Sequence, residues 1–279
     1  MSVVVAARRR LRPRDAVFWI AVAFLALVAV IAIFPALFAT HDPLQTEVRE
    51  ALLPPSGAHL FGTDQSGRDV YSRVIYGAGP SVGIGLLATT LALVIGLVLG
   101  SLAGVAPRPI DTVAMRINDI VLAFPEFLIA LIIVALLGPG HVNVAIAVTI
   151  AAVPVYIRLA RTSTRSLRIA EHVEASRILG VGPVRAFVRH VAPGVLGSLS
   201  VLATIGIGSS ILAAAGLSFL GLGPTEPTAE WGLMLAGGRN VIGTAWWVSL
   251  FPGVAISTTV IAATIVGRRL RARADGVRS

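Results

Sequence analysis

The sequence predicts an all-α membrane protein with six transmembrane helices, and three observations support this fold class. The chain has 279 residues, of which 56% are hydrophobic and only 13% charged, whereas soluble domains have about 25% charged residues. Six apolar runs are each long enough to cross a bilayer as a helix. The basic residues, all of them arginine, cluster between alternate runs, as the positive-inside rule describes for cytoplasmic segments.

The first expected helix follows the basic stretch RRRLRPRD, and its apolar run is too long for a cleaved signal peptide, so it is read as an uncleaved anchor. Small residues let helices approach closely in lipid, so glycines in the second and fifth runs predict helix contacts at Gly83, Gly85, Gly96, Gly100, Gly206 and Gly208. The six expected helices cover residues 16–38, 80–104, 116–137, 141–160, 195–222 and 245–267.

The arginines also predict the orientation. Six spans place both ends of the chain on one side of the membrane. If both ends are cytoplasmic, 19 of the 23 basic residues lie inside, and those outside are Arg49, Arg68, Arg73 and Arg239. We therefore expect cytoplasmic termini, a cytoplasmic loop after the fourth helix, and external segments at 39–79 and 223–244. The net charge of +9 follows from this bias and does not call for a nucleic-acid partner.

The sequence lacks the usual catalytic patterns. Without cysteine there is no disulfide or thiol chemistry, and without lysine there is no P-loop for ATP. HExxH and GxSxG are absent, which leaves an intramembrane protease or lipid enzyme only as a remote alternative. No group of histidines has the spacing of a metal site; they are His41, His59, His141, His172 and His190. The sequence therefore predicts no catalytic residue, no metal site and no cofactor.

The loop after the fourth helix is much longer than a simple connection requires, since it extends over 161–193. A short helix is expected at 172–179, with Glu174 near its N-terminus and the small residues Ala175 and Ser176 beside it. Gly180 and Gly182 permit a sharp turn. A second short amphipathic helix follows and is expected to end at Pro193-Gly194. This arrangement is typical of a docking element.

Four arginines precede the short helix at spacings of three, four and three residues, which places them on one helical stripe: Arg158, Arg161, Arg165 and Arg168. Either they reach lipid phosphates from the end of the fourth helix, or they form a basic face for a protein partner. The direction in which the stripe faces is left open by the sequence.

The loop resembles the cytoplasmic signature E-A-A-x3-G-x9-I-x-L-P of ATP-binding-cassette (ABC) importer permeases. Glu174, Ala175, Gly180 and Pro193 match it, and Ser176 replaces an alanine, while His190 and Ala192 depart from it. Three further blocks resemble the C-type permease subunit of dipeptide, oligopeptide and nickel importers: HLFGTDQSGRDVYSRVIYG at 59–77, LSFLGLGPTEPTAEWGLML at 217–235 and AWWVSLFPGVAI at 245–256. Gly79 and Pro80 stand where relatives often have an arginine before a serine.

The resemblance implies the type I ABC importer permease fold, similar to the methionine importer, in a bacterial cytoplasmic membrane. Residues 1–79 would comprise the N-terminal tail, first helix and external segment, and 80–279 the transmembrane domain. It also implies a heterodimer with a second permease, two cytosolic ATPase subunits that bind ATP and Mg²⁺, and an extracytoplasmic solute-binding protein. The chain itself would be no enzyme, and segment 172–182 would be the coupling helix. The expected cargo is a dipeptide or oligopeptide, with nickel or glutathione as alternatives.

Several polar and aromatic residues have two interpretations. Glu126 follows Pro125 within the third expected span, so it either lines the translocation path or makes a buried hydrogen bond. Asp119 is expected to pair with Arg116. A polar turn is predicted for Asp64, Arg68 and Asp69, whose functional interpretation is contact with the binding protein. The tryptophans are expected in an interfacial belt, with substrate stacking as the alternative; they are Trp231, Trp246 and Trp247.

Two other functional classes compete with the importer. A secondary transporter driven by an ion gradient would favour paired intramembrane acids or inverted repeats, and neither pattern is visible in the sequence. A passive channel or scaffold is the second. Transport that is insensitive to ATP depletion would favour either of them over the importer.

Overall fold

The computed structural model describes residues 13–276. Within this range the regular elements are helices, and an isolated bridge joins Thr63 to Asp69. The prediction of an all-α fold is confirmed. The long helices are α1 (Pro13–Ile33), α2 (Val70–Val105), α5 (His141–Leu167), α8 (Ala192–Phe219) and α10 (Trp247–Gly276).

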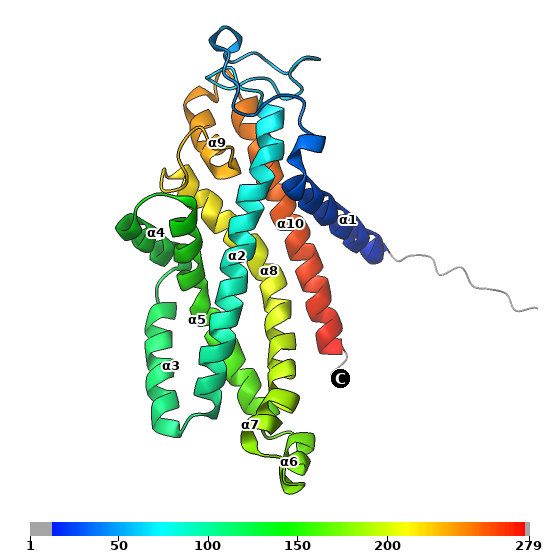
Figure 1. The fold of residues 1–279 in the computed structure, drawn as a ribbon, viewed down its shortest axis with the longest axis vertical. Coiled ribbons are helices and arrows are strands. Elements are labelled where there is room, and N and C mark those ends of the chain that lie inside the picture. The colour runs from blue at the N-terminus through cyan, green and yellow to red at the C-terminus, as the bar shows by residue number, and fades with distance from the viewer. Residues whose placement is uncertain (1–12, 277–279) are drawn as a thin grey trace, which may run out of the picture.

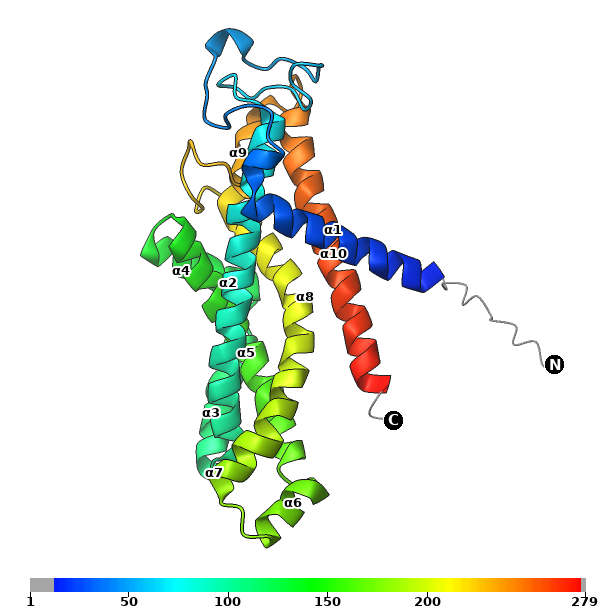
Figure 2. The same ribbon diagram turned by 45° about the vertical axis from the view of Figure 1, so that its right-hand side comes forward.

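The centre of the molecule is formed by α2, which packs against both α5 and α8 (Figure 1). On the far side of α8 lies α10. Helix α1 contacts α2 and α10 from outside and slants away from the bundle toward its N-terminal end (Figure 2). The two ends of the elongated molecule are hereafter called the outer end (residues 34–69 and 220–246) and the loop end (residues 168–193).

The third expected span is wrong as a continuous helix. The chain forms α3 (Arg108–Leu122) and α4 (Glu126–Leu137), which meet at an angle of 87°. Pro125 explains the break, because a proline disfavours the helical conformation of the residue before it and lacks the N–H that would continue the ladder. Among the described residues, five helices are long and apolar enough to cross a membrane, and the bent pair would make a sixth.

The second helix begins ten residues earlier than its apolar run. The carboxylate of Asp69 accepts a hydrogen bond from the N–H of Ser72 at 2.8 Å and so caps the first turn of α2. The helix then continues through Pro80. The apolar run locates the part of α2 that is apolar enough to cross a membrane, whereas the cap locates its true start.

Most of the glycines mark close helix contacts, as predicted. A Cβ added to Gly96 would lie 2.2 Å from the Cβ of Tyr156, and one added to Gly85 would lie 2.4 Å from Ile211. Gly100, Gly206 and Gly208 also face neighbouring helices. Gly83 is the exception, because a Cβ there would meet nothing within 4 Å.

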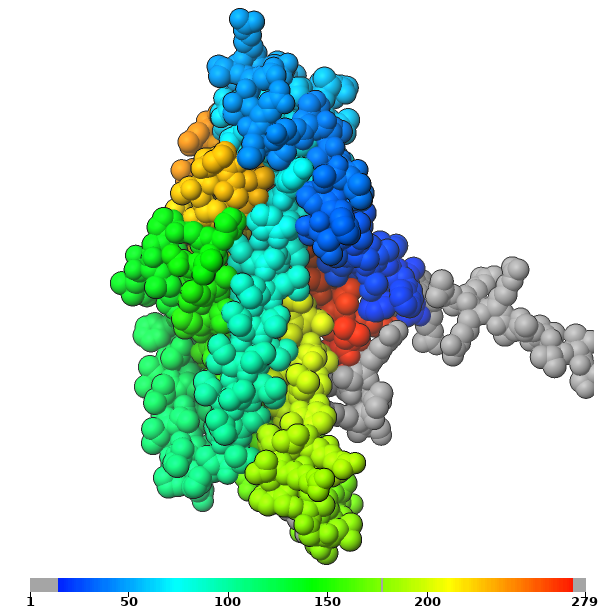
Figure 3. All heavy atoms as spheres, in the orientation of Figure 1, coloured from blue at the N-terminus to red at the C-terminus, as the bar shows by residue number. Residues whose placement is uncertain are grey.

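The remaining elements lie at the two ends of the molecule. The outer end contains η1 (Pro35–Leu37), η2 (Val48–Glu50), α9 (Trp231–Gly238) and η4 (Arg239–Val241). The loop end contains α6 (Glu171–Ile178), α7 (Pro183–Ala186) and the π-turn η3 (Phe187–Val191). In the space-filling view the loop end forms a narrow projection beyond the long helices (Figure 3).

The expected helix end at Pro193-Gly194 is wrong, since one helical run extends over Pro183–Phe219. Pro193 has no N–H to donate, and the wider π-turn lets the helix pass this position. The N–H of Ala192 accordingly bonds to the carbonyl of Phe187, five residues back. The short amphipathic helix predicted after Gly182 is therefore the first part of the same rod as α8.

Candidate functional site

The loop end holds the short helix α6 against the base of the bundle (Figures 1 and 2). Val173 is fully buried in a cluster with Val191, Val195 and Leu199, which belong to the Pro183–Phe219 run. His172 and His190 lie edge to face across the same junction, with ring centroids 6.2 Å apart. The position of α6 is thus set by an apolar contact with the rod that crosses the molecule.

The turn after α6 is determined by Gly180. Its φ of +82° lies in the left-handed region that favours glycine. The N–H of Val181 bonds to the carbonyl of Ser176 at 3.1 Å, the long hydrogen bond of a Schellman cap. The Ser176 hydroxyl is buried and donates to the carbonyl of Val173 at 2.7 Å. The predicted helix and glycine turn are therefore present.

The outward side of this loop is apolar and open. Ile178 and Leu179 are 81% and 83% exposed. Val184 and Val188 are also strongly exposed on the following helix. Glu174 and Ala175 are exposed beside them, and a Cβ at Gly180 or Gly182 would meet nothing within 4 Å. Pro193 is exposed in the rod itself. The predicted loop residues other than Ser176 therefore share an accessible surface, here called the loop face, with Ile178 and Leu179.

The arginine stripe faces the rest of the chain, which neither interpretation of the stripe foresaw. Arg161 forms a two-pronged ion pair with buried Asp111 of α3, at 2.5 and 2.6 Å. Arg165 reaches the same carboxylate at 2.9 Å. Arg158 pairs with Asp119, so the expected local pair between Asp119 and Arg116 is replaced by one between helices. Arg168 donates to the carbonyl of Gly104 at 3.0 Å.

These ion pairs fix α3 and the end of α2 onto α5. A planar guanidinium can bond both oxygens of one carboxylate, so Arg161 and Asp111 define the angle of α3 as well as its distance. The acids and the arginines lie on separate expected helices, so the sequence does not indicate which of them pair. The structure shows the pairs, because the bend at Pro125 leaves α3 beside α5. The stripe is thus an internal clamp at the base of the bundle.

Glu126 is the first residue of α4, directly after the break between the two helices of the bent pair. Its side chain forms no hydrogen bond or ion pair with another residue in the described range 13–276. It lies close enough to Tyr156 for the two to interact electrostatically. The Tyr156 hydroxyl is buried in the centre of the bundle and also lacks a hydrogen-bond partner among the described residues. A carboxylate and a hydroxyl are thus left free near the bend.

The predicted polar turn at the outer end is a buried ionic cluster. Arg68 bonds to Asp64 at 2.7 Å and to Glu226 at 2.6 Å. Burial lowers the pKa of Arg68, but the hydrogen bond to Glu226 and the charges of Asp64 and Glu226 outweigh it and raise that pKa above its ordinary value. Asp64, Arg68 and Asp69 are each less than 9% exposed. They hold the outer end together and present little surface of their own.

The sequence analysis missed Arg73 and Glu230 as structural residues. Arg73 is 1% exposed and donates to the carbonyls of Pro43, Pro227 and Thr228. It thereby joins the segment before α2 to the one before α9. The sequence offers one indication: Arg73 stands four residues after Asp69, within the block 59–77 that resembles permease subunits. A buried arginine bonding to carbonyls has no sequence pattern of its own.

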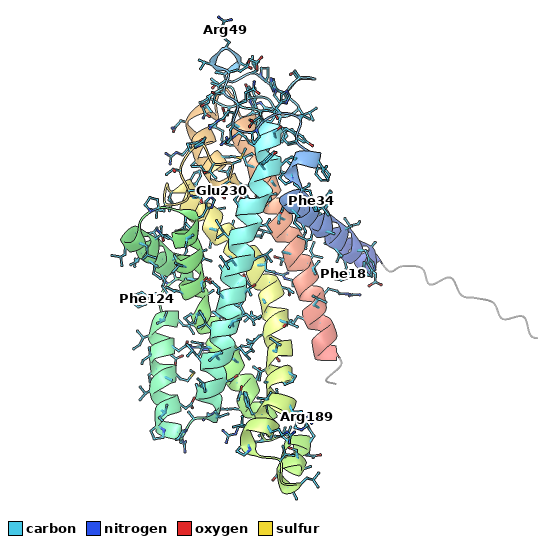
Figure 4. The ribbon with its side chains drawn as sticks, viewed as in Figure 1. Phe18, Phe34, Arg49, Phe124, Arg189 and Glu230 are labelled. Atoms are coloured by element: carbon cyan, nitrogen blue, oxygen red, sulfur yellow. The ribbon has the colours of Figure 1, made fainter. Side chains whose placement is uncertain are left out.

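Glu230 is 1% exposed and caps α9 by accepting from the N–H groups of Gly232 and Leu233 at 2.9 and 2.8 Å. It lies between the helices of the outer end (Figure 4). Ser81 of α2 donates to Glu230 and accepts from the N–H of Trp231. This connects α9 directly to α2.

Two of the three tryptophans are buried, so the expected interfacial belt is wrong for them. Trp231 donates to the carbonyl of Val74 at 2.8 Å, and Trp247 donates to that of Thr63 at 3.1 Å. Both lie in the apolar cluster of the outer end. Trp246 is half-exposed and is the one of the three that can meet lipid headgroups.

The chain is similar in sequence to known transport proteins. A family model described as "Binding-protein-dependent transport system inner membrane component" matches residues 96–276. The chain is 42% identical over 259 residues to the di/tripeptide transport system permease protein DppC of Pseudomonas aeruginosa (strain UCBPP-PA14), covering 90% of this chain and 85% of that protein. It is 40% identical over 256 residues to the nickel transport system permease protein NikC of Escherichia coli (strain K12), covering 92% of each.

A solved structure with a similar fold is the methionine ABC transporter MetNI in inward-facing conformations. The match has a TM-score of 0.59 and covers 71% of this chain and 95% of that one. The sequence identity is 19%, so this match concerns the fold. It confirms the expected methionine-importer-like architecture.

Proposed function

We propose that this chain carries dipeptides or oligopeptides into the cytosol, and the premise is its family. The chain belongs to the family of binding-protein-dependent transport system inner membrane components. It is a multi-pass permease of the bacterial plasma membrane and forms part of an ABC importer. Such a subunit moves solute by alternating access, receiving it from a binding protein outside. Nickel is the second candidate cargo, because one relative of 40% identity is a nickel transport permease.

The observation that carries the proposal is the loop face. Large apolar side chains that protrude at the narrow end of a membrane protein are exposed to water and call for a protein partner. Ile178 and Leu179 project there, at the end of a helix whose N-terminal turn carries Glu174 and in the turn that follows it. We assign the loop face as the docking surface for a cytosolic ATPase subunit. The site consists of Glu174, Ala175, Gly180, Gly182 and Pro193, and the buried Ser176 supports it from behind.

The partners proposed are a second permease subunit, two ATPase subunits that bind ATP and Mg²⁺, and an extracytoplasmic solute-binding protein. Energy reaches the chain through α6. When the ATPase dimer closes on ATP, α6 moves with it, and the buried contact of Val173 with Val191 passes this motion to the Pro183–Phe219 run. Import requires that nucleotide and solute favour different states of the permease.

We assign Glu126 to the translocation path. It is exposed, stands where α3 and α4 part, and has no hydrogen-bond or ion-pair partner among the described residues, which suits a group that meets a polar solute. Glu126→Gln keeps the shape and removes the charge. We expect a change in the KM or maximal rate of uptake in proteoliposomes containing the complete importer. Uptake identical to that of the wild type would contradict this role.

The solute-binding protein is proposed to contact the outer end. Asp64, Arg68 and Asp69 are buried, so their part in this contact is to hold the segment in shape while exposed neighbours meet the partner. This modifies the expectation that the three side chains themselves form the contact surface.

The docking proposal is tested by co-purification from the native membrane. Glu174→Arg and Ala175→Arg together place two positive charges on the loop face, where both side chains are exposed and the fold is little disturbed. We expect the ATPase subunits to be lost while the second permease is retained. The matched control changes the same residue types at the outer end, Glu47→Arg with Ala58→Arg, and keeps the ATPases. Equal recovery of the ATPases with both double variants would contradict the assigned surface.

Cargo is tested separately, because selectivity depends on the binding protein as well as on the permease. A strain lacking this chain should lose uptake of labelled dipeptides and oligopeptides and regain it with the wild-type gene. Loss of nickel uptake with peptide uptake unchanged would favour the nickel assignment.

A further inference from the structure

Two histidines and an aspartate that are far apart in the sequence meet at the outer end. His41 follows η1, His59 lies in the loop before α2, and Asp69 is the residue that caps α2. One ligand atom from each lies within 4.8 Å of the other two. The spacing of these residues along the chain matches no metal-binding motif, which is why the sequence did not predict the cluster.

The distances suit a single metal ion. His59 Nδ1 lies 2.9 Å from Asp69 Oδ1, and His41 Nδ1 lies 3.8 Å from Asp69 Oδ2. The two imidazole centroids are 4.9 Å apart. Zinc binds nitrogen and oxygen at about 2.0–2.2 Å, so two ligand atoms on one tetrahedral ion lie roughly 3.3 Å apart. A shift of about half an ångström at His41 would bring its Nδ1 to that separation from Asp69, and the three ligand atoms already lie within 4.8 Å of one another.

The cluster is held in place by neighbouring groups. Asp69 is fixed because its carboxylate caps α2 through the N–H of Ser72. The Ser72 hydroxyl accepts hydrogen bonds from the N–H groups of Thr40 and His41, at 3.2 and 3.0 Å, and so fixes the backbone that carries His41. Asp69 and His59 are buried, whereas the His41 side chain is 39% exposed. The ligands are therefore largely preorganised, with an opening on the His41 side.

A polar cavity of about 260 Å³ adjoins the cluster, and its lining adds three carboxylates, those of Asp42, Glu47 and Glu50. Glu50 lies 3.4 Å from His59 Nε2, on the other side of the ring from Nδ1, so it can hold the imidazole in place while Nδ1 meets the ion. The carboxylates that line the cavity favour the approach of cations. The room left beside the three groups also suits a bound water molecule.

We propose that His41, His59 and Asp69 bind one divalent transition-metal ion, with Zn²⁺ as the reference ion. Imidazole nitrogens with a carboxylate oxygen form a ligand set that zinc favours, whereas Mg²⁺ and Ca²⁺ prefer oxygen ligands alone. The ion would join the segment after η1 to the start of α2 and so stiffen the surface that faces outward. This proposal concerns the isolated chain and does not depend on the cargo or on the ATPases.

The test uses the complete chain, purified in detergent with a tag free of histidine, stripped with chelator and titrated with Zn²⁺. We expect one ion per chain, and a dissociation constant raised about 100-fold in His41→Ala, since even second-shell changes cost 10–100-fold. His41 is exposed, so this variant should fold. The matched control is His172→Ala, an exposed histidine at the loop end, which should bind as the wild type does.

Two further readouts separate this site from weak surface binding. Co²⁺ in place of Zn²⁺ should give the intense visible absorption of a tetrahedral site, and His41→Ala should lose it. Zn²⁺ should raise the unfolding temperature of the wild type but not of His41→Ala. Failure of the wild-type chain to bind Zn²⁺ at one equivalent would overturn the proposal. So would equal affinity in His41→Ala, which would leave the cluster as a set of histidine–carboxylate hydrogen bonds.

Discussion

Arg73 at the outer end is a buried charged side chain, whereas Leu179 at the loop end is an exposed apolar one. Arg73 is charged but 1% exposed, and carbonyls from two other segments surround its guanidinium. Leu179 is apolar but 83% exposed, and a glycine turn keeps it turned outward. The outer end satisfies its buried charged groups within the chain. The loop end exposes Ile178 and Leu179, on the surface that we propose for docking.

This difference indicates which end is stabilised within the chain and which end suits a partner. Buried charges are stable only when paired and hydrogen-bonded, and the outer end achieves this through Asp64, Arg68, Arg73 and Glu226. Large apolar side chains that gather on an exposed surface suit a binding partner, and among the described residues nothing covers Ile178 and Leu179. Substitutions in the buried ionic cluster of the outer end should therefore damage the fold, and substitutions on the loop face should damage assembly.

The largest effect is expected from Arg73→Met. The change leaves three carbonyls without their donor and removes a cation near Asp64, so the free energy of unfolding should fall by about 3–5 kcal/mol. Denaturant unfolding of the purified chain in detergent measures this. Arg49→Met is the control, because Arg49 projects from the tip of the outer end (Figure 4) and should cost less than about 0.5 kcal/mol. Equal losses would mean that the ionic cluster does not hold the outer end.

An intermediate effect is expected from Asp111→Asn in the clamp near the loop end. Its buried carboxylate pairs with Arg161 and Arg165. Because these arginines are partly exposed, solvent screening should reduce the loss to about 2 kcal/mol. The comparison is Asp119→Asn, whose pair with Arg158 is half-exposed and should contribute at most about 1 kcal/mol, decreasing with salt. The same unfolding assay at low and high salt distinguishes the two, and the reverse ranking would show that Asp111 is not the anchor of α3.

The smallest effect on folding is expected from Ile178→Ser combined with Leu179→Ser. Both side chains are exposed, so the free energy of unfolding should change by less than about 0.5 kcal/mol. Recovery of ATPase subunits with the chain should nevertheless fall at least about 10-fold, the equivalent of about 1.4 kcal/mol of binding. A clear loss of stability with normal recovery of the ATPases would reverse the assignment of the two ends.

Composition and apolar runs predicted the helical fold, because a bilayer requires about 20 apolar residues for each span. The glycines located the turn after α6, because Gly180 adopts a left-handed conformation that favours glycine. The bend at Pro125 was misread because the residues on both sides of it are apolar enough to span. The passage through Pro193 was misread because a π-turn has no sequence signature.

The outer end was harder to predict, for a physical reason. Its stability depends on pairings between distant segments, such as Arg68 with Glu226 and Ser81 with Glu230, and single residues do not indicate such partners. The same holds for the His41, His59 and Asp69 cluster. The loop face was easier, because its docking signature is contained within one short segment and the resemblance to a known family identified it.

The unbroken helical run from the loop end to the outer end has a mechanical consequence. Its 37 residues correspond to a rod of roughly 55 Å. A tilt of about 5° around one end displaces the other end by roughly 5 Å, close to the pitch of an α-helix. If α6 rocks as proposed, leverage would amplify the motion into a shift as large as one helical turn at the far end of the rod, without any residue along the rod having to change its own conformation.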